Sequence, residues 1–249
     1  MPLFQNATYA ASVATLDDPL PESAGEIAFA GRSNAGKSSA INTLATRRRL
    51  AFVSKLPGRT QMINFFALGE MRFLVDLPGY GYASVPGSIR SKWDKVLGNY
   101  LQGRPELRGM ALMMDIRHPM TELDQRMIEF MQPTGIPIHV LVTKSDKLAR
   151  TEAIARLKTV REALALLSPN YSAQLFSSLK RSGIEEAEAV FAGWLSMPQS
   201  KTPARGKLAG VEPGSATPIK KPVNTSGRIR RRTDGIWKPK NKSPQAKGE

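Results

Sequence analysis

The chain lacks several features that would place it outside the reducing interior of a cell. Its 249 residues include no cysteine, so a disulfide framework is excluded. No apolar run approaches the roughly 18 residues that a membrane-spanning helix needs. No apolar segment of the kind found in secretory signals precedes Arg32, the first basic residue. These absences predict a soluble, cytoplasmic protein with no membrane partner.

Positive charge and proline are concentrated at the C-terminal end. Residues 198–249 hold 13 of the 36 Lys and Arg, 3 of the 21 Asp and Glu and 7 of the 18 Pro. Such a composition cannot bury enough apolar surface to offset the entropy of ordering the chain. We therefore expect a loosely packed lead-in over 1–24, anchored by Phe4 and Tyr9, a folded domain over 25–197, and a basic, disordered tail over 198–249.

The most informative stretch is Gly31–Ser38, which has the pattern G-x-x-x-x-G-K-S. An apolar run, Glu26–Ala30, precedes it and predicts a strand, and Ser38–Ala45 has the pattern of a helix. Glycines allow the backbone to turn tightly, so that successive N–H groups can surround phosphates at a helix N-terminus. The pattern predicts that Lys37 reaches the β- and γ-phosphates and that the Ser38 hydroxyl binds Mg²⁺. The full loop consists of Gly31, Arg32, Ser33, Asn34, Ala35, Gly36, Lys37 and Ser38.

Apolar segments of strand length alternate with amphipathic segments of helix length, which predicts an α/β domain. The predicted strands are Glu26–Ala30, Ile63–Ala67, Met71–Asp76, Met110–Met114, Ile136–Val142 and Ala173–Phe176. The predicted helices are Ser38–Ala45, Ser88–Gln102, Thr121–Met131, Thr151–Leu167 and one that ends near Leu195. We therefore expect a three-layer domain with a six-stranded, mostly parallel sheet, one antiparallel edge strand and helices on both faces.

Polar clusters follow four of these strands. They are Gly31–Ser38, the segment Asp76-Leu77-Pro78-Gly79, the segment Thr143-Lys144-Ser145-Asp146, and the segment Ser177-Ser178-Leu179. Ligands of open α/β sheets bind beyond the carboxyl ends of the strands, so the clusters are expected to meet at one edge. Taken alone, an Asp-x-x-Gly segment is usually a turn, but after a phosphate loop it indicates a metal and γ-phosphate contact.

Asp146 predicts the choice of base. Its two oxygens can accept hydrogen bonds from N1–H and the exocyclic amine of guanine, which adenine does not offer. Charged hydrogen bonds contribute about 1.5–3 kcal/mol each, so the pair gives roughly 10²–10⁴-fold preference for guanine. Lys144 is expected to pack along the base, and the Ser177–Leu179 backbone to donate to guanine O6. The other reading, a solvated loop after a strand, stays open on local grounds.

Together these motifs resemble the ordered set of translation-factor-class GTPases. More narrowly, the chain resembles the EngB (YihA/YsxC) family of bacterial ribosome-biogenesis GTPases. The narrower resemblance rests on the Gly-Arg-Ser-Asn start of the phosphate loop and on three further segments. These are Pro57–Gln61 followed by Ile63–Phe66, Asp76–Tyr82, and Asp115–Pro119; Trp93 with Tyr100 and Leu101 also fits the family.

The resemblance implies a G-domain that binds GTP or GDP with Mg²⁺. It also implies association with the large ribosomal subunit during assembly and a link to normal cell division and septation. It further implies that 51–61 is a switch segment in which the Thr60 hydroxyl binds Mg²⁺, with Asp76 acting through water. Additional expected nucleotide contacts are Gly58, Arg59, Thr60, Gln61 and Met62.

Catalysis is expected to be slow. Where many GTPases have a water-positioning glutamine after the Asp-x-x-Gly glycine, this chain has Tyr80, which has no carboxamide. Lys37, Thr60 and Gly79 are the expected catalytic contacts. Asn34 is a candidate ligand for a monovalent cation such as K⁺, and the alternative that it only braces the loop is equally open.

The basic tail is a candidate contact for ribosomal RNA. It combines Arg228–Arg232 with Trp237–Lys240, cations with one stacking aromatic. A solvated tail without a dedicated partner is the other reading. Two functional alternatives to a monomeric assembly factor also remain, a GTP-gated RNA-binding module with incidental hydrolysis and a GTPase of another process such as tRNA modification.

Overall fold

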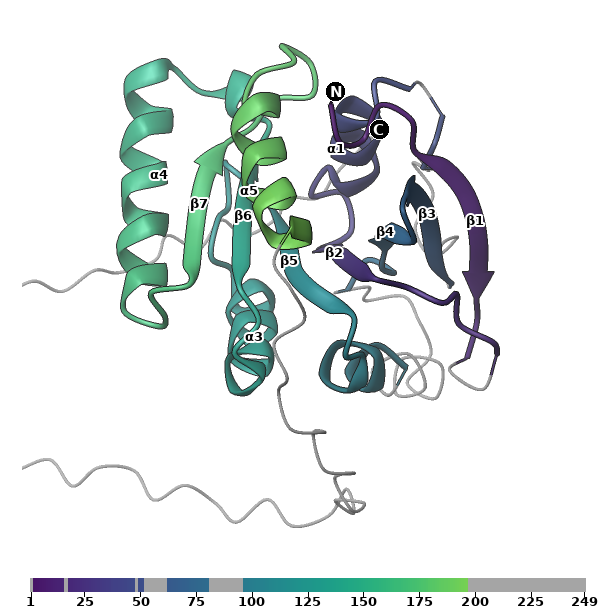
Figure 1. The fold of residues 1–249 in the computed structure, drawn as a ribbon. Coiled ribbons are helices and arrows are strands. Elements are labelled where there is room, and N and C mark those ends of the chain that lie inside the picture. The colour runs from purple at the N-terminus through teal and green to yellow at the C-terminus, as the bar shows by residue number, and fades with distance from the viewer. Residues whose placement is uncertain (1, 16–17, 48, 52–61, 81–95, 197–249) are drawn as a thin grey trace, which may run out of the picture. The chain divides into compact units, whose positions relative to one another are not determined.

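The computed structural model describes residues 2–15, 18–47, 49–51, 62–80 and 96–196 (Figure 1). They belong to one compact unit that spans Met1–Arg205. The predicted tail, most of the predicted switch segment 51–61 and the segment 81–95 lie outside the described residues.

A seven-stranded sheet forms the centre of the domain, in the order β1-β3-β4-β2-β5-β6-β7. The strands are β1 (Thr8–Val13), β2 (Gly25–Gly31), β3 (Ile63–Gly69), β4 (Arg72–Asp76), β5 (Leu107–Asp115), β6 (Ile138–Thr143) and β7 (Tyr171–Leu175). The helices are α1 (Lys37–Leu44), α3 (Glu122–Met131), α4 (Arg150–Ala165) and α5 (Ile184–Ser196), and residues 96–103 are also helical. Short 3₁₀ turns, η1 (Gln132–Thr134) and η2 (Ser145–Lys147), complete the described elements.

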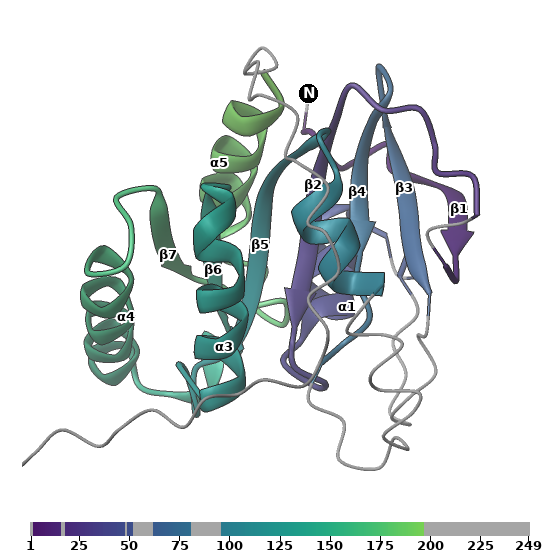
Figure 2. The same ribbon diagram turned by 90° about the horizontal axis from the view of Figure 1, so that it is seen from below.

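The expected three-layer α/β architecture is confirmed. Strands β4, β2, β5, β6 and β7 run parallel, and β3 joins the sheet antiparallel to β4. One apolar core contains side chains of α3, α4 and the helix over 96–103, and a second core contains side chains of α1 and α5. The helices therefore cover both faces of the sheet (Figure 2).

The sheet has one strand more than predicted. The segment Thr8–Val13, expected to be part of a loose lead-in, pairs antiparallel with β3 and forms the edge. Most of its side chains are small, polar and at least partly exposed, so no alternating apolar pattern announces it. Phe4 anchors the lead-in as expected and is fully buried, with its ring centroid 6.1 Å from that of Phe29 and 5.8 Å from that of Phe191. Tyr9 is 62% exposed, and its ring packs edge-on against that of Phe66, with the centroids 6.3 Å apart.

A buried carboxylate joins the helix over 96–103 to β2. Glu26 is fully buried and accepts hydrogen bonds from the Tyr100 hydroxyl at 2.7 Å and from Arg104 Nη2 at 2.6 Å. Burial, together with the Glu26 charge, raises the pKa of Tyr100 well above its usual value. The phenol is therefore a neutral donor, and Arg104 supplies the charge that balances Glu26.

The five parallel strands end at one edge of the sheet, and this edge positions the site. Their last residues are Gly31 in β2, Asp76 in β4, Asp115 in β5, Thr143 in β6 and Leu175 in β7. Within the described ranges, no helix is long and apolar enough to cross a bilayer.

Candidate nucleotide-binding site

The glycine loop connects β2 to α1 and requires glycine at two positions. A Cβ on Gly31 would lie 3.0 Å from both Cβ and O of Met113, so β2 and β5 approach too closely there for a larger residue. Gly36, just before α1, has φ of 95°, a left-handed conformation that side chains disfavour. Asn34 is also left-handed, with φ of 63°. The loop thus turns twice before it enters the helix.

Lys37 and Asp76 meet at the N-terminus of α1. The Lys37 ammonium contacts Asp76 Oδ1 in an ion pair, and both residues are buried. Asp76 closes β4, so the glycine loop and the Asp-x-x-Gly segment share one end of the sheet. The glycine loop and the Asp76–Gly79 segment are thus in contact, as the order of the strands predicts.

The donors near this pair suit magnesium. Ser38, next to Lys37, offers a hydroxyl, and Asp76 offers a carboxylate, both hard oxygen donors of the kind that Mg²⁺ takes together with water. In the part of the chain that the structure describes, three or more His, Asp or Glu side chains nowhere gather into a group that could hold a metal. Thr60, the third expected ligand, lies outside the described residues.

The end of β6 is bonded to the glycine loop. The Thr143 hydroxyl donates to the carbonyl of Ala35 at 2.5 Å, and Lys144 Nζ donates to the carbonyl of Asn34 at 2.7 Å. Lys144 also reaches Asp115 Oδ2 at 2.8 Å. The Lys144 side chain is therefore stretched between two loops, as a residue that braces a bound base would be.

Asp115 is a site residue that the motif analysis did not select. Besides Lys144, it accepts from Arg117 through Nη2 at 2.6 Å and Nε at 3.0 Å. Burial works to raise the pKa of Asp115, but the hydrogen bonds from Arg117 and Lys144 outweigh burial and hold that pKa below its usual range. Its position at the end of a predicted strand could have identified Asp115 as a site residue. It ends β5 and is in register with Thr143, which ends β6.

The loops after β6 and β7 also join. The Ser177 hydroxyl donates to Asp146 Oδ1 at 2.5 Å, and the Ser145 N–H donates to the carbonyl of Phe176 at 3.2 Å. The Asp146 side chain is only 6% exposed. Its carboxylate is thus fixed in orientation by a neighbour from the last strand.

Tyr80 is bonded to α3. Its hydroxyl donates to Asp124 Oδ1 at 3.0 Å, and Asp124 is fully buried. The same carboxylate caps α3 through the N–H and hydroxyl of Thr121, and it lies 3.4 Å from Nε of Arg32 in the glycine loop. Burial, then the Asp124 charge, raise the pKa of Tyr80 well above its usual value. Asp124 is a second residue that the motif analysis missed; the local pattern Thr121-x-x-Asp124 predicts a capping box at the start of α3 but not the contact with Tyr80.

The predicted site residues therefore fall into two groups. Ion pairs and hydrogen bonds bring the four strand-end clusters together. The residues that make these contacts are Asn34, Ala35, Lys37, Asp76, Thr143, Lys144, Asp146 and Ser177. Gly58, Arg59, Thr60 and Gln61 lie outside the described residues, and Met62 is 46% exposed. Ser178 lines a neighbouring hollow, and Leu179 is 71% exposed.

Comparisons with known proteins agree with this arrangement. A family profile described as "50S ribosome-binding GTPase" matches residues 26–144. The "Probable GTP-binding protein EngB" of Methylobacillus flagellatus is 58% identical over 204 residues, 82% of this chain and 98% of the relative. Its namesake from Dechloromonas aromatica is 53% identical over 220 residues, 88% of this chain and 100% of the relative.

Solved structures share the fold. The crystal structure of a probable GTP-binding protein engB is 21% identical with a TM-score of 0.56, covering 69% of this chain and 98% of that one. Aquifex aeolicus Era bound to GDP and AlF4⁻ is 19% identical with a TM-score of 0.58, covering 73% and 60%. At such identities the likeness concerns the P-loop GTPase fold alone. The close relatives carry the assignment: this chain is a GTPase that belongs to the EngB family of GTP-binding proteins.

Proposed function

We propose that this GTPase is a slow, Mg²⁺-dependent switch in the assembly of the large ribosomal subunit, and that normal cell division and septation depend on it. The observation that carries the proposal is the family description, "50S ribosome-binding GTPase", whose model matches residues 26–144 and so includes the glycine loop, Asp76 and Lys144. The protein acts as a cytoplasmic monomer, and its basic tail contributes contacts to ribosomal RNA.

In this proposal the glycine loop holds the phosphates. Backbone N–H groups of 31–38 surround them, Lys37 contacts the β- and γ-phosphates, and the Gly79 N–H meets the γ-phosphate. Mg²⁺ is held by Ser38 and Thr60, and by Asp76 through water. The ion pair between Lys37 and Asp76 supports this assignment, because it brings the cation of one motif to the carboxylate of the other.

Guanine is selected by Asp146, with Lys144 along the base and the backbone of Ser177–Leu179 at O6. The hydrogen bond from Ser177 leaves lone pairs on both Asp146 oxygens, so the carboxylate can still accept from the base. An ordered carboxylate loses less entropy on binding than a free one, which supports the choice of this residue.

Hydrolysis is slow because the position after Gly79 carries a phenol whose hydroxyl is bonded to Asp124. We propose that K⁺ at Asn34 compensates by neutralising charge that develops on the phosphates. The alternative is that Asn34 only braces the loop. The left-handed backbone of Asn34 is consistent with that role, since asparagine tolerates this conformation better than most residues. GTP turnover in KCl and in NaCl decides between them: a faster rate in KCl supports the cation, and equal rates exclude it.

Sedimentation tests the switch. Large subunits are centrifuged through sucrose gradients with the full chain and GTP, GDP or a non-hydrolysable GTP analogue. Cosedimentation with the analogue and release with GDP are expected. Binding that ignores the nucleotide would favour a plain RNA-binding module with incidental hydrolysis, which the Tyr80 position also suits. Absence of any binding would favour a GTPase of another process, such as tRNA modification.

A further inference from the structure

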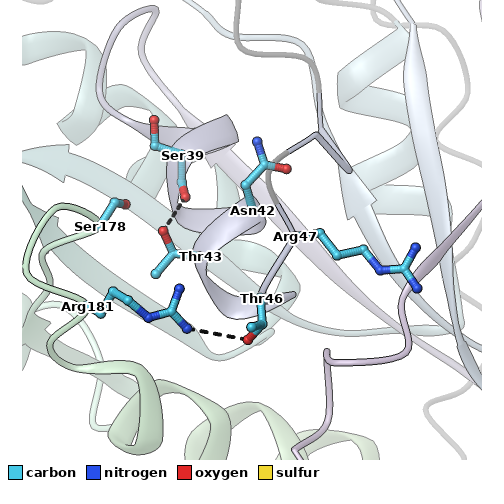
Figure 3. A pocket seen from close by; sticks show the side chains of 7 residues that line it. All are labelled: Ser39, Asn42, Thr43, Thr46, Arg47, Ser178 and Arg181. Atoms are coloured by element: carbon cyan, nitrogen blue, oxygen red, sulfur yellow. Dashed lines mark hydrogen bonds between the residues drawn. The ribbon is translucent and has the colours of Figure 1, made fainter.

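A polar hollow lies beside the nucleotide site, between α1 and the loop that follows β7 (Figure 3). Its volume is about 390 Å³. One side is formed by α1 and the residues after it, which contribute Ser39, Asn42, Thr43, Thr46 and Arg47. The loop after β7 forms the other side with Ser178 and Arg181. Ser39 directly follows the predicted Mg²⁺ ligand Ser38, and Ser178 belongs to the predicted guanine-contacting segment Ser177–Leu179, so the hollow adjoins the nucleotide site and shares Ser178 with it.

The lining is rich in donors and contains no carboxylate. Hydroxyls come from Ser39, Thr46 and Ser178, and guanidinium groups from Arg47 and Arg181, whereas the Thr43 hydroxyl already donates to the carbonyl of Ser39 at 2.7 Å. Arg181 Nη2 makes one long hydrogen bond, 3.5 Å, to the Thr46 hydroxyl (Figure 3). Within the described ranges, neither arginine has an acidic partner.

Several arginines elsewhere on the domain pair with nearby carboxylates, in contrast to the two in the hollow: Arg72 with Glu70, Arg126 with Glu122 and Arg156 with Glu152. Around the hollow the sequence supplies none, because no Asp or Glu occurs between Glu26 and Glu70 or between Leu175 and Ile184. The same stretches add Arg49 and Lys180. An uncompensated cluster of this kind attracts a polyanion.

We propose that this hollow, which we call the α1 hollow, binds a backbone phosphate of RNA. Guanidinium groups fit phosphate in a bidentate geometry, and short hydroxyls complete the contacts of its oxygens, which only accept hydrogen bonds. The proposal rests on the proposed function, since it identifies the face of the G-domain that meets ribosomal RNA. RNA then contacts the residues on either side of the nucleotide, which makes its binding sensitive to the state of the nucleotide.

The test compares two double variants of the full chain. Arg47→Ala/Arg181→Ala removes both guanidinium groups from the α1 hollow. Arg150→Ala/Arg156→Ala removes the same charge from α4, which packs on β7 at the far edge of the sheet. All four side chains are exposed, so both variants are expected to fold, and thermal unfolding checks this. Affinity for a fluorescent RNA hairpin of large-subunit sequence is measured from 50 to 300 mM KCl.

The α1 hollow variant is expected to bind RNA about tenfold or more weakly. The slope of log K against log salt should flatten by about 0.7–0.9, since that is what the loss of one phosphate contact removes. GTP affinity should stay within about twofold of the wild type, and the α4 variant should leave both the RNA affinity and the slope nearly unchanged.

Three results would overturn the inference. Equal slopes for the two variants would show that the α1 hollow binds no phosphate of the RNA. A loss of GTP affinity in the α1 hollow variant would assign the hollow to the nucleotide. Competition by poly-glutamate as strong as by RNA at equal charge would indicate an acidic protein partner. The proposed function is judged separately, because wild-type cosedimentation with the large subunit does not depend on the outcome of the hairpin titration.

Discussion

Replacing Tyr80 by phenylalanine tests whether this residue is structural or catalytic. The change removes one hydroxyl, which donates at 3.0 Å to the buried carboxylate of Asp124, and keeps the ring. Hydrogen bonds to charged groups contribute about 1.5–3 kcal/mol. Because Tyr80 is partly exposed, we expect the free energy of unfolding to fall by about 1–2 kcal/mol, which lowers Tm by roughly 2–8 °C in a domain of this size.

The matched control is Tyr171→Phe. Tyr171 is more buried than Tyr80, with 8% of it exposed, but its hydroxyl makes no hydrogen bond within the described part of the chain, so its loss should change Tm little. A double-mutant cycle of Tyr80→Phe with Asp124→Asn should give a coupling energy of about 1 kcal/mol, because the two residues share one bond.

Single-turnover GTP hydrolysis provides the second measurement. With its hydroxyl bonded to Asp124, Tyr80 is not available to orient water, so the variant should hydrolyse bound GTP within about threefold of the wild-type rate. The reasoning is refuted if the variant keeps wild-type stability and loses tenfold or more in rate, because the hydroxyl would then act on the reaction.

Three further predictions use other buried contacts. Asp115→Asn weakens the acceptor of Lys144 and should reduce affinity for a fluorescent GDP roughly tenfold, whereas Arg117→Ala, which removes only an exposed partner, should reduce it less. Arg104→Ala leaves the buried Glu26 without its cation and should cost about 3–5 kcal/mol in urea unfolding, against under about 1 kcal/mol for Arg108→Ala, because Arg108 is half-buried and donates its hydrogen bond to a carbonyl, that of Ala24. Burial lowers the pKa of His139, so its contribution to stability is present above pH 6.5 and is lost as the pH falls through the pKa of the folded state. In the wild type the urea midpoint should therefore fall between pH 7.5 and pH 5.5, and this fall should be smaller in His139→Gln. An equal fall in the variant would contradict the prediction.

The sequence predicts the parallel part of the sheet well, because each of its strands is a short apolar run that ends in a polar cluster. The rule that ligands bind beyond strand ends then brings the four clusters together without knowledge of any contact. The edge strand β1 was missed for a physical reason. An edge strand is held by backbone hydrogen bonds to a single neighbour, so small and polar side chains suffice and no apolar pattern is needed.

Two site residues were missed because their roles depend on contacts between distant segments. Asp124 lies 44 residues from Tyr80 along the chain, and Asp115 lies 29 residues from Lys144. Each is an ordinary acidic residue in its local sequence. Only the folded arrangement makes each one a shared acceptor, since neither a periodic pattern nor a turn motif encodes which cation will reach it.

The contact between Phe4 and Phe191 has a consequence for how the protein is made. Phe4 is synthesised well before α5, yet its ring packs against Phe191 of α5, the last described helix of the domain. The apolar core beneath α1 and α5 therefore stays incomplete until nearly the whole domain has been synthesised. Phe29, which packs against both Phe4 and Phe191, lacks the second of these contacts until then. A nascent chain that stalls before α5 exposes this aromatic surface, which makes the late stage of synthesis the point of greatest demand for chaperones.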